Sequence, residues 1–164
     1  MCYKNKDFYS GQWENEKKNG LGVMKFHNGE IYNGQWENDQ MFGIGKFDYL
    51  NGDVYYGGWK NLKQNGEGKM VYCSNDDFKE YQGNWIDGIR HGYGKLTYLN
   101  EDIYEGNFES DIINGKGKME YKNGEVYEGL WQSGLKFGKG ELIIPDKEIY
   151  SGEWVNDRYH GQGT

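Results

Sequence analysis

Alanine is absent from this chain of 164 residues, and leucine is sparse, so the strongest helix formers are missing. Proline occurs only once, at Pro145. The apolar content consists largely of Val, Ile, Phe, Trp and Tyr, which favour strands, and aromatic residues make up 17% of the chain. This composition disfavours a helical protein and predicts an all-β fold.

Long hydrophobic runs are also lacking. The longest aliphatic run is Leu142-Ile143-Ile144, whereas a membrane-spanning helix needs roughly 20 apolar residues. No apolar segment of the kind found in a signal peptide follows the first residues, and no Asn-x-Ser/Thr acceptor for glycans occurs. The two cysteines, Cys2 and Cys73, lie far apart in the sequence. We therefore expect a reducing, cytoplasmic location.

Basic clusters are missing as well. The formal net charge is −7, and Lys and Glu residues are interspersed along the chain. Nucleic-acid binders usually carry a basic patch, so we expect no nucleic-acid partner. Anionic lipid is disfavoured for the same reason.

Glycine and aromatic residues instead recur with a regular period. The motif Tyr-x-Gly-x-Trp, with Phe108 in place of one Trp, begins at Tyr9, Tyr32, Tyr55, Tyr81, Tyr104, Tyr127 and Tyr150. Six steps separate these motifs, and all are 23 residues long except one of 26. A Gly-x-Gly motif follows each of them at a fixed distance. Such a period predicts a tandem repeat.

Each repeat has the pattern of a β-hairpin. Tyr9, Gly11 and Trp13 alternate with polar residues and share one face, and we place Gly20 and Gly22 of the second strand on that same face. Asn-Gly pairs such as Asn28-Gly29 tolerate positive φ and are expected in the turns between repeats. The glycines leave room for a ring over the backbone. Residues 1–164 are thus predicted to form one array, an elongated, single-layer, twisted antiparallel sheet of about seven hairpins with one aromatic face.

The spacing of Tyr-x-Gly-x-Trp and Gly-x-Gly resembles that of the MORN repeat (membrane occupation and recognition nexus). The resemblance covers residues 3 to 164 and implies a scaffold that dimerises and joins membrane-associated or cytoskeletal complexes. Scarce Ala, Arg and Pro with abundant Asn, Lys, Ile and Tyr is typical of an AT-rich genome. Together these features favour a protist scaffold of the apicomplexan type, located in cell-division or cortical structures.

Departures from the repeat are few. Phe108 replaces a Trp, Glu101 and Lys147 replace turn glycines, and Pro145 enters a turn; we expect no function from them. A three-residue insertion within 73–80 is expected to bend the array. Partial repeats at both ends suggest a segment of a longer array whose ends promote association.

Motifs of enzymes are not found. The Gly-x-Gly motifs lack the third glycine of a dinucleotide-binding loop, and neither a P-loop nor a Gly-x-Ser-x-Gly motif occurs. A single-layer sheet offers an open groove instead of a pocket that excludes water. We therefore expect that this chain is not an enzyme and requires no cofactor.

The aromatic residues of the repeats have two interpretations. They form the core, or they remain half exposed along a groove and bind a partner. Burial of this face against a second copy would give an isologous homodimer. The candidate groove and dimer residues are Trp13, Trp36, Trp59, Trp85, Phe108, Trp131, Trp154, Tyr127 and Tyr150.

One set of residues has the chemistry of a metal site. Cys73, Asp76 and His91 could bind zinc, since thiolate, carboxylate and imidazole are zinc ligands. Cys73 and His91 flank opposite ends of a predicted strand, so a shared ion needs a sharp bend or a second chain. The alternative is a free thiol and a solvent-exposed histidine.

The sequence thus predicts a non-catalytic scaffold that binds itself and other scaffold or cytoskeletal proteins, at the cytoskeleton or the membrane cortex. The main alternative is a phospholipid-binding module, which would need a basic stripe. Two others are a glycan-binding array and a repeat region attached to an enzyme outside this segment.

Overall fold

The computed structural model describes residues 6–73, 77–147 and 149–164. Within these residues all regular elements are β-strands and none is a helix, so no helix there is long and apolar enough to cross a membrane. The strands are β1 (Phe8–Glu14), β2 (Lys17–Lys25), β3 (Ile31–Glu37), β4 (Gln40–Asp48), β5 (Val54–Lys60), β6 (Lys63–Val71), β7 (Phe78–Ile86), β8 (Ile89–Tyr98), β9 (Ile103–Glu109), β10 (Ile112–Glu120), β11 (Val126–Gln132), β12 (Leu135–Ile143), β13 (Ile149–Val155) and β14 (Arg158–Gly163). They pair in the order of the sequence, which confirms the predicted all-β hairpin array.

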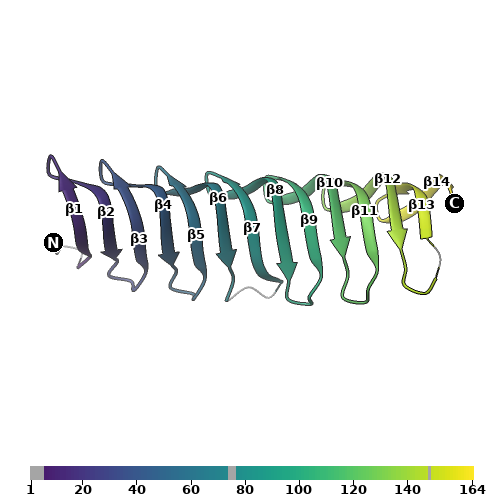
Figure 1. Cartoon of the computed structure of the whole chain (residues 1–164), viewed down its shortest axis with the longest axis horizontal. Helices are drawn as coiled ribbons and strands as arrows, with labels where there is room; N and C mark the ends of the chain where they lie inside the picture. Colours follow the sequence, from purple (N-terminus) through teal and green to yellow (C-terminus); the bar gives the residue numbers. More distant parts are fainter. Residues whose placement is uncertain (1–5, 74–76, 148) are drawn as a thin grey trace. The chain divides into compact units, whose positions relative to one another are not determined.

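The chain divides into two compact units. The first unit comprises residues 1–75 with 84–89, and the second comprises 76–83 with 90–164. In each unit consecutive strands lie side by side and run antiparallel (Figure 1). The segment 74–76 of the insertion lies outside the described residues, so the bend expected there stays a prediction.

Two-residue turns close the hairpin of each repeat. In the first turn Asn15 and Glu16 have φ of 48° and 63°, and Asn38 and Asp39 have the same geometry in the next repeat. Positive φ at both central positions is characteristic of the type I′ turn, whose twist matches that of the flanking strands. The Asn-Gly pairs lie between repeats, as predicted, but only their glycines have positive φ.

A bulge at the Gly-x-Gly motif interrupts every hairpin whose internal strand register is described, which leaves out β7–β8. The register of β1 and β2 shifts between Gly11 and Trp13, and Gly20 has a φ of 74°. The Oε1 atom of Gln12 accepts a hydrogen bond from the backbone N–H of Leu21 at 2.8 Å, and a Cβ at Gly20 would collide with it. In the β2–β3 register Gly20 lies opposite Trp36, as the predicted aromatic face requires, but the bulge on the β1 side turns this glycine toward Gln12.

The second glycine of the motif lies under a tyrosine ring. A Cβ at Gly22 would overlap the ring of Tyr9, which is completely buried. The hydroxyl of Tyr9 donates to the carbonyl of Gln12 at 2.9 Å, so its polar atom is satisfied within the same repeat. The predicted contact between bare backbone and an aromatic ring is confirmed at these positions.

Aspartates link consecutive repeats at the strand ends. Asp39 accepts a hydrogen bond from the backbone N–H of Lys18 at 2.9 Å, and Asp53 accepts one from Cys73 at 2.7 Å. In the second unit, Asp111 and Asp157 accept the bond that corresponds to the one at Asp39, from the backbone N–H groups of Arg90 and Lys136. Asp102 accepts the bond that corresponds to the one at Asp53, from the backbone N–H of Lys122. These bonds join residues about one repeat apart, so they stabilise the stacking of neighbouring hairpins.

The turn at Asn61-Leu62 provides a test of the turn geometry. Leu62 has a φ of 65° although it is not a glycine and its side chain is exposed. A leucine in this region is strained by about 1 kcal/mol, and Asn-Gly is the preferred type I′ pair. Leu62→Gly is therefore expected to raise the free energy of unfolding by roughly 0.5–1 kcal/mol, as measured by urea denaturation. Unchanged or lower stability would contradict the assigned turn type.

Candidate protein-binding surfaces

The repeat tyrosines pack edge-on against aromatic rings of their own repeat and of the next one, in most cases the indoles of two tryptophans. Tyr9 contacts Trp13 of its own repeat edge-on, at a centroid distance of 5.1 Å, and Trp36 of the next repeat at 5.5 Å. The Nε1–H of Trp36 donates to the carbonyl of Gly22 at 3.2 Å. The next tyrosine, Tyr32, packs in the same way against Trp36 and Trp59. The aromatic rings therefore hold neighbouring repeats together within each unit.

Most of the predicted groove residues lie in this core. The side chains with 5% exposure or less are Trp36, Trp59, Trp85, Phe108, Trp131, Trp154 and Tyr127. Tyr150 is partly exposed, and Trp13 is 40% exposed. The core interpretation agrees with this burial, whereas contact of these rings with a partner stays a prediction.

Cationic side chains cover the rings at one end of the hairpins. The Nζ of Lys18 lies 4.8 Å from the ring centroid of Trp36, and that of Lys136 lies 5.2 Å from that of Trp154. Burial lowers the pKa of Lys136, although Asp157 acts in the opposite direction. These lysines combine cation–π contacts with coverage of apolar surface by their alkyl chains.

Arg90 holds the position equivalent to Lys18 and Lys136 in the repeat that begins at Tyr81. It is 9% exposed, and its guanidinium lies 4.9 Å from the ring of Phe78 and 5.6 Å from that of Phe108. The Nε donates to the carboxylate of Asp111 at 3.0 Å. The buried Nη1 has no hydrogen-bond partner among the described residues and lies in this aromatic environment. A phenyl ring is smaller than an indole, so Phe108 leaves space for the guanidinium.

The zinc hypothesis is not supported by a cluster in the described structure. Cys73 is an exposed free cysteine, and Asp76 lies outside the described residues. Among residues 6–73, 77–147 and 149–164, no group of three or more His, Cys, Asp or Glu side chains could hold a metal ion. A zinc site formed with Asp76 or with a second chain stays a prediction.

The face opposite the rings carries two rows of side chains in the second unit. They come from the variable positions of the repeat motifs and lie in register on neighbouring strands. The first row contains the pairs Tyr93–Asn107, Lys116–Leu130 and Lys139–Glu153. The second row is Lys95, Glu105, Lys118, Glu128, Glu141 and Ser151.

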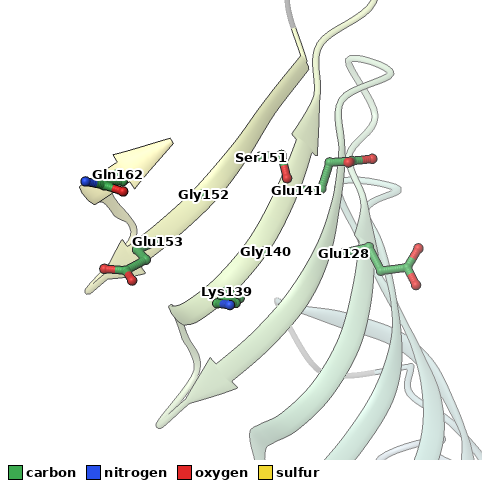
Figure 2. A pocket seen from close by; sticks show the side chains of 8 residues that line it. All are labelled: Glu128, Lys139, Gly140, Glu141, Ser151, Gly152, Glu153 and Gln162. Carbon is green, nitrogen blue, oxygen red and sulfur yellow. The ribbon is translucent and has the colours of Figure 1, made fainter. Parts of the chain in front are cut away.

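These rows line an open groove, here called the cross-strand groove because it runs across the strands. Its larger part, a pocket of about 710 Å³, extends from Tyr93 on β8 to Lys139 on β12. A second pocket shares Glu128 and Lys139 and continues to Gln162 on β14. Figure 2 shows this second pocket, where the side chains project from β11 to β14. The groove is shallow and exposed, which suits an elongated ligand.

The first unit has a different surface at the corresponding positions. Leu21, Phe42, Ile44 and Tyr56 are between 45% and 62% exposed, and the strand registers place them on the face opposite the rings. We call these four residues the apolar patch. At its margin Lys46 and Asp48 form an ion pair of 2.7 Å. An exposed apolar patch with a charged margin is typical of a protein-binding site.

Neither surface is among the residues predicted from the sequence. The predicted residues are the regular Tyr and Trp positions, whereas the exposed side chains belong to the variable positions between them. The signal available in the sequence was the chemical contrast at the middle of Gly-x-Gly, which is Leu21 and Ile44 in the first unit but Lys116 and Lys139 in the second.

The hairpins, turns and ring contacts define a tandem β-hairpin repeat protein. The family model of the MORN repeat matches residues 9–31, 32–54, 55–77, 81–102, 104–126, 127–148 and 150–164. The chain therefore belongs to the MORN repeat family. A comparison with curated protein sequences gives no match.

Solved structures with a similar fold include two domains in complex with segments of other proteins. One is the TCP domain of SAS-4 (dCPAP) from Drosophila melanogaster in complex with a proline-rich motif of Ana2 (dSTIL), with a TM-score of 0.56, 12% identity and coverage of 93% of this chain and 82% of that chain. The other is the TCP10 domain of Danio rerio CPAP with a STIL peptide, with a TM-score of 0.53, 13% identity and coverage of 88% and 63%. At this identity the similarity shows a common fold.

The pairing of Arg90 with Phe108 gives a testable stability effect. We expect Phe108→Trp to lower the free energy of unfolding by roughly 1–3 kcal/mol, because the larger ring overlaps the guanidinium. In the first unit, Met41 and Trp59 are one pair at positions equivalent to Arg90 and Phe108, and Met41 is buried there. The double variant Phe108→Trp/Arg90→Met should therefore recover most of the loss. A loss that persists in the double variant, measured by urea denaturation, would refute the steric explanation.

Proposed function

We propose that this chain is a non-catalytic scaffold module that binds protein partners through the face opposite its aromatic core and joins them in a cytoskeletal or membrane-associated assembly. The observation that carries the proposal is the cross-strand groove, which side chains from seven strands line. A ligand in this groove contacts several repeats at once. An extended segment of a partner protein fits such a surface better than a compact substrate.

The groove combines the features of a peptide site. The ring of Tyr93 is 55% exposed and is oriented by a hydrogen bond from its hydroxyl to Glu105 at 2.8 Å. Leu130 adds an exposed apolar side chain three strands away, and Asn107 on β9 and Lys116 on β10 lie between it and Tyr93. An exposed aromatic ring beside polar side chains is the type of surface that binds proline-rich segments in other domains.

The two similar structures support the same proposal. Each is a complex of a domain of this fold with a peptide, and the peptide of the Drosophila complex is a proline-rich motif. We infer that this chain also takes a proline-rich, extended segment, in the cross-strand groove of the second unit.

A titration with an uncharged probe tests this assignment. Decaproline added to the isotopically labelled chain should shift amide resonances of β8–β12 on the groove face. Tyr93→Ala should weaken binding by about fivefold, because contact with a ring contributes about 1 kcal/mol. Leu99→Ala removes an exposed side chain in a turn outside the groove and serves as the control. Absence of binding, or equal loss in both variants, would contradict the proposal.

Self-association is proposed for the apolar patch of the first unit. The patch lacks charged residues among its four members and lies on a strand face, so two copies can bury it by symmetric contact. This assignment differs from the ring surface predicted from the sequence, which stays a prediction, because most of those rings are buried whereas the four patch residues are exposed. The proposed assembly is a homodimer with the cross-strand groove left available to partners.

Light scattering measures the mass of the chain in solution and so tests the proposed homodimer. The chain has a mass of 19.1 kDa, so we expect twice that mass in solution. Ile44→Glu places a charge in the patch and should give a monomer, whereas Leu50→Glu, in a 69% exposed turn position, should not. A repeat with EDTA tests whether zinc contributes to the dimer. A wild-type monomer at high concentration would exclude the proposed contact.

A further inference from the structure

The spacing of the repeats along the cross-strand groove limits the conformation of its ligand. Each repeat adds two strands, and neighbouring strands lie about 4.8 Å apart, so equivalent positions recur about every 9.6 Å. A polyproline II helix has three residues per turn and rises about 3.1 Å per residue, so its faces recur about every 9.3 Å. Over two repeats the two periods differ by only about 0.6 Å.

Other conformations match less well. In a β-strand, residues three apart point to opposite faces, so such a peptide cannot present the same side chain direction to each repeat. An α-helix returns to the same face after seven residues, about 10.5 Å, which gives a difference of about 1.8 Å over two repeats. The groove therefore fits a polyproline II peptide that crosses the strands and meets one repeat every third residue.

Three equivalent positions of successive repeats determine the chemistry of such a ligand. Tyr93, Lys116 and Lys139 each occupy the middle of a Gly-x-Gly motif, on β8, β10 and β12, and are separated by 23 residues. All three side chains are exposed in the groove. Lys116 and Lys139 have no ion-pair partner among the described residues, whereas the neighbouring Lys118 pairs with Glu120 at 2.6 Å.

We propose that the groove recognises a polyproline II segment of a partner protein with a proline over Tyr93 and acidic residues three and six positions further along, paired with Lys116 and Lys139. This inference rests on the proposed function and specifies the ligand of the same site. In this arrangement the proline stacks on the ring of Tyr93. Leu130 lies opposite Lys116 in the strand register, so its side chain contacts the ligand residues between the two acidic positions.

The acidic side chains of the groove lie mainly outside this row. Glu105 accepts the hydrogen bond from Tyr93, and Glu128 and Glu141 belong to the second row of the groove. Glu153 faces Lys139 in the register, and its carboxylate lies over Gly161, beyond the second lysine. Repulsion by Glu153 therefore limits the acidic positions of the ligand to two.

The test compares three synthetic peptides of ten residues, each with a fluorescent label. The first is decaproline, the second has aspartates at its positions 5 and 8, and the third has aspartates at positions 5 and 7. Fluorescence anisotropy at low ionic strength gives the affinity of each for the full chain. We expect the peptide with a spacing of three to bind about fivefold more tightly than the peptide with a spacing of two. In a polyproline II helix a carboxylate two positions along points away from the second lysine, so one exposed ion pair of about 1 kcal/mol is lost.

Charge reversal on the protein identifies the contacts. Lys116→Glu and Lys139→Glu should each weaken binding of the spacing-three peptide by roughly fivefold to tenfold and leave decaproline unaffected. Lys60→Glu, an exposed lysine of the first unit that lies opposite Lys63 in the register, is the control and should change neither affinity. Circular dichroism verifies that all variants are folded.

The results separate the two proposals. If decaproline binds but the two acidic peptides have equal affinities, the proposed pairing of acidic residues with Lys116 and Lys139 is refuted and the peptide-binding function remains. The same holds if the Lys116→Glu and Lys139→Glu variants change the affinity no more than the Lys60→Glu control. If no peptide binds, both proposals fail. Selective binding of the spacing-three peptide that is lost in both reversals establishes the inference.

Discussion

The contact between a tyrosine ring and glycine backbone is the constraint on which the rest of this structure depends. Tyr9 is completely buried in a single sheet because Gly11 and Gly22 have no side chains to keep the ring away from the backbone. Its hydroxyl is satisfied by a carbonyl three residues along, so burial leaves no unpaired polar atom there. The indole rings then pack on the edge of the tyrosine and bring the next hairpin into place.

This core removes the need for a second layer of secondary structure. Nearly all constraint falls on the Tyr, Gly and Trp positions, and the residues between them face solvent on the other side of the sheet. Evolution of binding specificity can therefore act on positions such as Ile44 and Lys116 without affecting the core. Ile44 in the apolar patch and Lys116 in the cross-strand groove both occupy the middle of a Gly-x-Gly motif, so the same position of the repeat carries different chemistry in the two units.

Changes within the core itself require compensation. Phe108 lacks the indole N–H that elsewhere bonds to a glycine carbonyl of the preceding repeat, as Trp131 does with Gly117. Arg90 replaces part of that interaction, because its guanidinium packs on the ring and its Nε pairs with Asp111. From the sequence Phe108 is only a mild departure from the repeat, since the partner residue lies 18 positions away and its contact is not visible in the repeat pattern.

The sequence by itself determined the hairpin array, the number of repeats and the aromatic face, because the Tyr, Gly and Trp spacing admits few other structures. It did not reveal the bulge at Gly20, since a register shift moves a residue between faces without altering the period. Only the tertiary structure decided which side chains are available to a partner. Burial of a ring such as Trp36 depends on the neighbouring repeat. The exposure of Lys116 and Lys139 in one groove depends on the pairing of β10 and β12 with β11, which lies between them.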